Sequence, residues 1–172
     1  MQAFVVFGAV LGVFLTTTLA DDNIDVSNKG NDGGDVHQTV NINNQDNVAN
    51  INNYNGWESW NTIYDYNRGL FATRLLSRKS CIVARMNPTV FLSLAQLRKM
   101  AQEKQTPNNS PSPAKAQYRV SQLQLKNFAQ YGEHIEALCK AIPTYYAQEI
   151  KGAKCGGCGA SIITILGISM CF

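Results

Sequence analysis

The chain has 172 residues, a formal net charge of +3 and 45% hydrophobic residues. This length and composition fit one domain whose apolar side chains are sufficient for a core. Five cysteines in so short a chain favour an oxidising compartment. The sequence contains no nucleophile–base constellation, phosphate-binding loop or paired carboxylates, so we expect neither enzymatic activity nor a cofactor.

The charge is divided unevenly between the two halves of the chain. Residues 21–70 carry eight acids and two bases, which gives −6, whereas residues 71–172 carry four acids and thirteen bases, which gives +9. The basic half could attract acidic mucins or anionic lipid. The alternative is that two oppositely charged faces meet within one fold. We expect no nucleic-acid partner.

Residues 1–20 have the composition of a signal peptide. The segment from Ala3 to Leu15 is apolar, and Thr18 and Ala20 are small residues at the positions that a signal peptidase inspects, which predicts cleavage after Ala20. No other stretch is apolar enough to span a membrane, so we expect a secreted protein without a transmembrane segment. Residues 21–34 are acidic and rich in Asn and Gly, which predicts a flexible N-terminal arm.

Two regions show the alternation of β-strands. Residues 35–53 alternate on either side of a turn at residues 43–46 and predict a hairpin. Residues 59–86 predict a meander of three short strands, in which Asn67 and Gly69 favour the first turn because both residue types tolerate positive φ. His37, in the hairpin, has no partner residues that would indicate a metal or catalytic role.

The next segment changes to helical periodicity. Asn87 and Pro88 are typical of a helix start, and the apolar spacing after them predicts a helix over 88–104. Residues 105–117 have the composition of a mobile linker and contain a glycosylation sequon at Asn108. A capping-box pattern at Ser121 predicts a second helix over 121–140, which would place His134 on its surface.

The C-terminal segment 151–172 contains a Cys-x-x-Cys pattern followed by an uncharged apolar run. Residues 161–171 have no charge and no proline and are dominated by Ile, Leu and Met, which is typical of an aggregation-prone strand. We expect this strand to be covered, either within the sheet or by a partner. The sequence supplies no second cysteine pair or nearby histidine for zinc, and the acidic arm does not complete a calcium loop, so we expect no metal site.

Several of these features together resemble the BRICHOS domain and, more closely, the gastrokines, secreted proteins of the stomach lining. The BRICHOS pattern consists of Asp65 near a hairpin, Cys81 at the start of the next strand, and Cys139 far downstream. The sequence segments that resemble gastrokines are Asn47–Asn50, Asn55–Asn61 and Ala72–Leu75. This resemblance implies an α+β fold in which a small, mainly antiparallel β-sheet is flanked by two α-helices. The domain would span residues 35–150, with a core over about 54–150.

The resemblance also implies roles for particular residues. It pairs Cys81 with Cys139 and Cys158 with Cys171, which leaves Cys155 as a free thiol or as the link of a disulfide-bonded homodimer. A Cys155–Cys158 bridge is the rival arrangement. Asp65 would be the signature carboxylate, either partly buried with a raised pKa or capping a turn. Client peptides would bind a face of the meander formed by Tyr64, Tyr66, Leu70 and Ala72.

Two functions are compatible with this resemblance. In the first, the protein is a chaperone-like module that captures β-prone segments, with its own C-terminal segment and amyloid-prone peptides as clients. In the second, it is a secreted ligand that acts on an epithelial receptor. Either would serve the role associated with gastrokines, which is to protect the gastric epithelium and restrain its proliferation.

Overall fold

The structure, a computed structural model, describes residues 21–29, 35–103, 116–151, 155, 161–165 and 168–172. Its described strands form one ten-stranded mixed sheet in the order β1-β2-β3-β4-β5-β6-β8-β7-β10-β9. The pairs β6–β8 and β7–β10 are parallel, and the other neighbours are antiparallel. In chain order the strands are β1 (Asp22–Lys29), β2 (Asp35–Asn43), β3 (Val48–Tyr54), β4 (Trp60–Asp65), β5 (Leu70–Leu75), β6 (Ser80–Arg85), β7 (Ala116–Gln124), β8 (Thr144–Glu149), β9 (Ile162–Ile165) and β10 (Ile168–Cys171).

The hairpin and the meander predicted from alternation are confirmed. The hairpin is β2–β3, and the meander is β4–β5–β6 with each strand antiparallel to the next. Gly69 has φ +62° in the turn between β4 and β5, a conformation that glycine adopts without strain. Residues of β4–β6 point alternately to two separate buried clusters, so both faces of the meander are covered.

Helices lie on both faces of the sheet, but they are short. Helix α1 (Leu94–Glu103) packs Leu94, Leu97 and Ala101 against the cluster that contains Tyr64 and Phe71. Helix α2 (Glu133–Cys139) packs Ile135 and Leu138 against the opposite face, beside Ala72 and Val83. Two single-turn 3-10 helices, Gly56–Glu58 and Ala129–Tyr131, complete the described helical segments.

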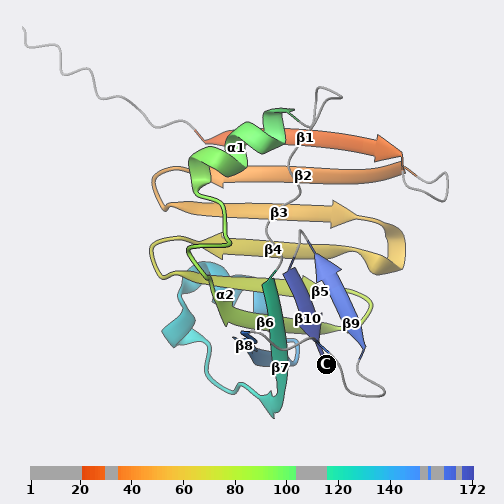
Figure 1. Cartoon of the computed structure of the whole chain (residues 1–172), viewed down its shortest axis with the longest axis vertical. Coiled ribbons are helices and arrows are strands. Elements are labelled where there is room, and N and C mark those ends of the chain that lie inside the picture. Colours follow the sequence, from red (N-terminus) through yellow and green to blue (C-terminus); the bar gives the residue numbers. More distant parts are fainter. Residues whose placement is uncertain (1–20, 30–34, 104–115, 152–154, 156–160, 166–167) are drawn as a thin grey trace, which may run out of the picture.

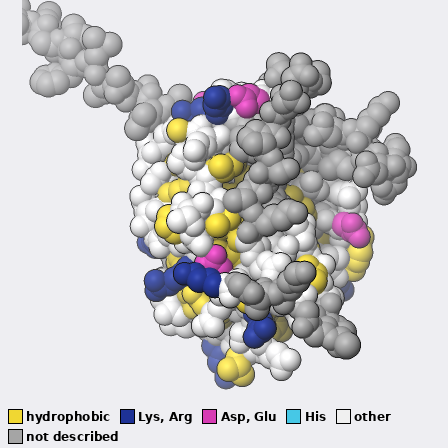
Figure 2. Space-filling view, in the orientation of Figure 1, with side chains coloured by type: hydrophobic (Ala, Val, Ile, Leu, Met, Phe, Trp, Pro, Cys, Tyr) yellow, Lys and Arg dark blue, Asp and Glu magenta, His cyan; other side chains and the backbone are white. Residues whose placement is uncertain are grey.

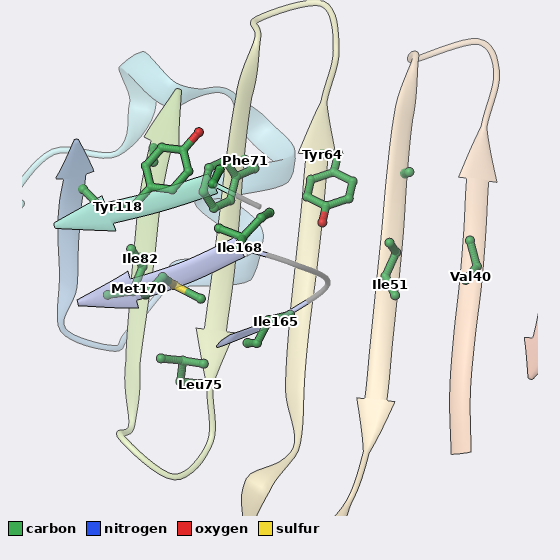
Figure 3. Close-up of a cluster of buried hydrophobic side chains, with 14 of the residues drawn as sticks. Val40, Ile51, Tyr64, Phe71, Leu75, Ile82, Tyr118, Ile165, Ile168 and Met170 are labelled. Carbon is green, nitrogen blue, oxygen red and sulfur yellow. The ribbon is translucent and has the colours of Figure 1, made fainter. Parts of the chain in front are cut away.

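The sheet does not remain flat. In Figure 1, β7, β10 and β9 cross in front of the layer formed by the earlier strands. Figure 3 shows Tyr118 on β7, Met170 and Ile168 on β10 and Ile165 on β9 directed toward Phe71, Ile82 and Leu75 of the meander. The far end of the sheet therefore covers one face of its own centre (Figure 3).

The expected fold, a small sheet flanked by two helices, is wrong. The structure is dominated by a ten-stranded mixed sheet, and α1 and α2 are ten and seven residues long. Much of the cover on one face comes from β7, β9 and β10 rather than from a helix. The expectation counted too few strands because it assigned β1 to a flexible arm, part of β7 to a helix, and β9 and β10 to one strand.

Three further expectations differ from the structure. Residues 22–29, assigned to the flexible arm, form β1, since Ile24 is buried against the core and Asp22 forms an ion pair with Arg98 of α1. The predicted helix over 121–140 is reduced to α2, and residues 121–124 belong to β7. Alternation at Ala116, Tyr118 and Val120, which are buried or half-buried, determines this strand. The helix predicted over 88–104 begins at Leu94.

Candidate strand-binding site

The turn after β4 is built around Asp65, which is only 1% exposed. Its carboxylate accepts a hydrogen bond from the backbone N–H of Arg68 at 3.0 Å and forms an ion pair with the Arg68 guanidinium at 3.1 Å. The guanidinium lies against Gly132 at the start of α2, where φ is +95°. Of the two roles considered for Asp65, this geometry is that of a turn cap, and it fixes the β4–β5 turn against the second helix.

An aromatic cluster occupies the face of the meander that β7 crosses. Phe71 lies within 6.3 Å, between ring centroids, of Tyr64, Phe91 and Tyr118. Burial raises the pKa of the Tyr64, Tyr66 and Tyr118 phenols well above their usual range. These phenols, which are neutral at physiological pH even without the shift, therefore add no charge to the cluster.

The C-terminal strand pair, β9 and β10, lies on this cluster. Ile165, Ile168 and Met170 are each at most 5% exposed and belong to the same core cluster (Figure 3). Strand β10 runs parallel to β7, with Ile168 opposite Ala116 and Cys171 opposite Arg119. The apolar run that the sequence identified as aggregation-prone is thus paired within the sheet, as two strands rather than one.

Two disulfides connect these elements. Cys81 of β6 is bonded to Cys139 of α2, with 5.5 Å between the Cα atoms, and both residues are fully buried. Cys171 is bonded to Cys155, with 5.8 Å between the Cα atoms. The expected Cys158–Cys171 pairing therefore differs from the structure, and Cys155 is not free to link a homodimer. Cys158 lies outside the described residues.

The expected client face is divided by the sheet. Tyr64 belongs to the cluster beneath β7 and β10, and Tyr66 packs against it. Ala72 belongs to the opposite cluster, and Leu70 packs against that one. The four residues do not form one surface. In the register of β4 against β5, Tyr64 lies opposite Phe71, so Leu70 and Ala72 point to the other face of the sheet. The prediction did not take this register into account.

Sequence reasoning missed the residues that do share the surface: Phe71, Phe91 and Tyr118. Alternation on β5 places Phe71 on the same side as Leu75, a signal that was available. The position of Phe91, which precedes α1, depends on a loop conformation that alternation does not specify.

A groove of about 390 Å³ continues from the end of β10. Val120, Ser121 and Gln122 of β7 line one side, and Arg78, Tyr145 and Phe172 line others. The Arg78 guanidinium lies over the Phe172 ring, 3.8 Å from its centroid. The groove therefore continues along β7 in the same direction as β10.

The face of the molecule shown in Figure 2 presents little continuous apolar surface among its described residues. Among the described side chains visible in Figure 2, hydrophobic groups form small separate patches. The aromatic cluster is covered in this state, so a ligand that uses it has to replace what covers it.

Other functional sites receive no support from the described residues. Within them, no group of three or more His, Cys, Asp or Glu side chains is placed to hold a metal ion. His37 stacks on Tyr54, and His134 lies 3.6 Å from the Asp46 carboxylate. No helix in the described part of the chain is long and apolar enough to cross a membrane. Asn108 and residues 1–20 lie outside the described ranges.

Comparisons with known proteins point to one family. Residues 56–146 match the BRICHOS domain family. The chain is 44% identical to gastrokine-1 of Sus scrofa and 39% identical to gastrokine-1 of Homo sapiens, in each case over 99% of this chain and 97% of the relative. It is 35% identical to gastrokine-2 of Rattus norvegicus over the same shares. No solved structure matches it significantly.

Proposed function

Because the chain belongs to the gastrokine family and contains a BRICHOS domain, we propose that it is a secreted mucosal protein without enzymatic activity that captures β-prone segments. By this capture it would keep such segments from forming fibrils. In the gastric epithelium it would support mucosal protection and restrain proliferation.

The observation that carries this proposal is the position of the chain's own β-prone segment. Residues Ile162–Ile165 and Ile168–Cys171 are paired in the sheet and shielded by the aromatic cluster. Main-chain pairing supplies affinity for any extended segment, while alternate side chains are buried. A fold that accommodates one such segment has the chemistry to accommodate others.

Secretion has two supports besides the family. Two disulfides join cysteines of the described chain, as is typical of proteins that mature in an oxidising compartment. The N-terminal twenty residues have the composition of a cleavable leader. Intact mass of the secreted product tests this part, with a mass corresponding to a start at Asp21 expected.

The test of capture is fibril formation by an unrelated β-prone peptide, followed by thioflavin T fluorescence. We expect the protein to lengthen the lag phase at substoichiometric ratio. The matched control is the variant with Cys81→Ala and Cys139→Ala, which should lose the effect because Cys81–Cys139 holds α2 on the meander. An unchanged lag phase with the native protein would refute capture.

The alternative is a secreted ligand that acts through an epithelial receptor or mucin without capturing strands. The separation of acidic and basic residues along the chain favours it, since charge patches steer association with charged partners. A ligand of this kind should slow epithelial growth at low concentration while leaving the fibril lag phase unchanged.

A further inference from the structure

We propose that the position held by β10 on the edge of β7 is the subsite that accepts a client strand, and that the C-terminal strand pair is its resident occupant. A client would displace β9 and β10, pair in parallel with β7 and extend into the groove beyond Phe172. The Cys155–Cys171 disulfide restricts this exchange. The inference deepens the proposed function and rests on it.

The first support is the unequal length of the paired strands. Strand β7 spans Ala116–Gln124, whereas β10 pairs with it only from Ala116 to Arg119. The groove begins where this pairing ends, with Val120, Ser121 and Gln122 on its wall. A longer parallel strand would therefore continue along β7 through space that already exists.

The second support is the pattern of burial along β10. Ile168 and Met170 face the aromatic cluster and are buried, Ser169 lies between them and is less buried, and Phe172 packs at the edge of the same cluster. A client that replaces β10 needs apolar side chains at alternate positions with small polar residues between them. This is the composition of β-prone segments.

The third support is the charge beside Phe172, at the end of the groove that adjoins β10. Arg78 and Lys79 line it and lie over the rings of Phe172 and Trp57. A carboxylate following the apolar positions of a client would meet both cations. The preferred client is therefore an extended apolar segment that ends in an acidic residue or a free carboxyl group.

The fourth support concerns how the resident pair is held. Its strands are four residues long, and Ile162 at the outer edge is 50% exposed. The covalent link to Cys155 ties down the end of β10, and the Cys155 N–H donates to the Gln117 side chain of β7 at 3.1 Å. Without this link, β10 would be held only by its four-residue pairing and by the burial of Ile168 and Met170.

The experiment compares two proteins that both carry Cys158→Ser, so that no leftover thiol can exchange. One keeps the Cys155–Cys171 link, and the other also carries Cys155→Ser and Cys171→Ser. The probe is a synthetic peptide copying residues 161–172 with serine for Cys171, a solubilising lysine tail on its N-terminus and a photo-crosslinker at the position of Ser169. Binding is measured by fluorescence anisotropy, and crosslinks are mapped by mass spectrometry.

We expect the open variant to bind the probe about tenfold more tightly, because the fraction of molecules with a vacant β7 edge is larger. Crosslinks should fall on β7 near Gln117, which is the partner of Ser169 in the resident pairing. Hydrogen exchange of the β9 and β10 amides should rise when the probe binds. Ser121→Trp should weaken binding severalfold, because it crowds the groove that the last residue of the probe, the copy of Phe172, lines, whereas Leu123→Trp at a neighbouring exposed position should not.

Equal affinity for the two proteins, or crosslinks confined to β9 or β1, would overturn the inference, since the probe would then have added to an outer edge of the sheet. Those results leave the proposed function intact if the native protein still lengthens the fibril lag phase. If neither protein affects the lag phase, it is the proposed function that fails.

Discussion

The two disulfides hold two regions of the molecule that differ in almost every respect. The central region, β4–β6 with α2, is held by Cys81–Cys139, and each of its strands is paired on both edges. The terminal region, β7 with β9 and β10, is held by Cys155–Cys171 and ends in β9, which pairs on one edge within the described sheet. One disulfide bond is fully buried, and the other joins residues nearer the surface.

The difference teaches how a chain can carry an aggregation-prone segment without exposing it. The central region forms a platform: on the face that α2 covers, side chains of the meander and of α2 are buried together in one cluster. The terminal region completes the other face with a segment that is short, apolar and last in the sheet. We therefore expect stability to be concentrated in the platform and the proposed strand exchange to be confined to the end.

The largest expected effect comes from removing the central disulfide. In the loop-entropy description, Cys81→Ala with Cys139→Ala should cost about 4 kcal/mol, because the bond closes a loop with a sequence separation of 58. Cys155→Ala with Cys171→Ala, which opens a loop with a separation of 16, should cost about 3 kcal/mol or less. Urea unfolding measures both. A larger loss from the terminal pair would reverse the proposed division of stability.

Substitution of one buried and one exposed isoleucine on β9 tests whether the terminal strands pack on the core as described. Ile165 is 4% exposed and Ile162 is 50% exposed, although they lie on the same strand. Ile165→Ala should cost about 2 kcal/mol or more, and Ile162→Ala less than about 0.5 kcal/mol. Equal values in urea unfolding would mean that β9 does not rest on the core.

The Asp65 turn gives a smaller effect within the central region. Asp65→Ala should cost about 2 kcal/mol, because it leaves the Arg68 N–H without its acceptor and removes a buried charged partner. Asp65→Asn is the control, since its side-chain oxygen still accepts the Arg68 N–H and only the ion pair with the half-exposed Arg68 side chain is removed, which should cost less than about 1 kcal/mol. Similar losses for the two variants would assign the effect to the ion pair instead.

The central region was predictable because its signal is local. Alternation over residues 59–86 and the glycine at position 69 specify three strands and their turn without knowledge of the rest of the chain. Because side chains alternate along a strand, Phe71 and Ala72 of β5 also fall on opposite faces of the sheet. The error at Tyr64, Tyr66, Leu70 and Ala72 arose because the register of β4 against β5, which places Tyr64 opposite Phe71, was not taken into account.

The terminal region was not predictable in the same way. The pairing of β10 with β7 joins residues about fifty positions apart in parallel, and nothing in either strand specifies that register. Which cysteine lies beside Cys171 depends on this register. The spacing of the cysteines in the sequence therefore could not show that Cys155, rather than the expected Cys158, is its partner. Residues 121–124 were misassigned because a Ser with polar residues around it suits a helix start as well as an exposed strand end.

The smallest and most local effect concerns Tyr118, whose ring lies between the two regions. Burial raises the pKa of its phenol, with a further contribution from the negative charge of Glu149. In the unfolded chain the pKa returns to about 10, so above that pH the unfolded state loses a proton that the folded state keeps. Stability should therefore fall by at most about 1.4 kcal/mol per pH unit for this tyrosine, from pH ~10 up to its folded pKa.

Removing the terminal disulfide should change this titration if the strand pair then leaves the core. In Cys155→Ala with Cys171→Ala, Tyr118 would meet solvent, so its pKa would fall and it would form phenolate at a lower pH than in the intact protein, although the Glu149 charge would still raise that pKa. Tyr66 is the internal control, because its hydroxyl donates to the Leu92 carbonyl at 2.7 Å, away from the terminal strands. Phenolate absorbance, with Tyr118→Phe to assign the signal, separates the two. An unchanged titration would show that β10 stays on β7 without its covalent link, and the exchange proposed above would then need a stronger competitor than strand pairing alone.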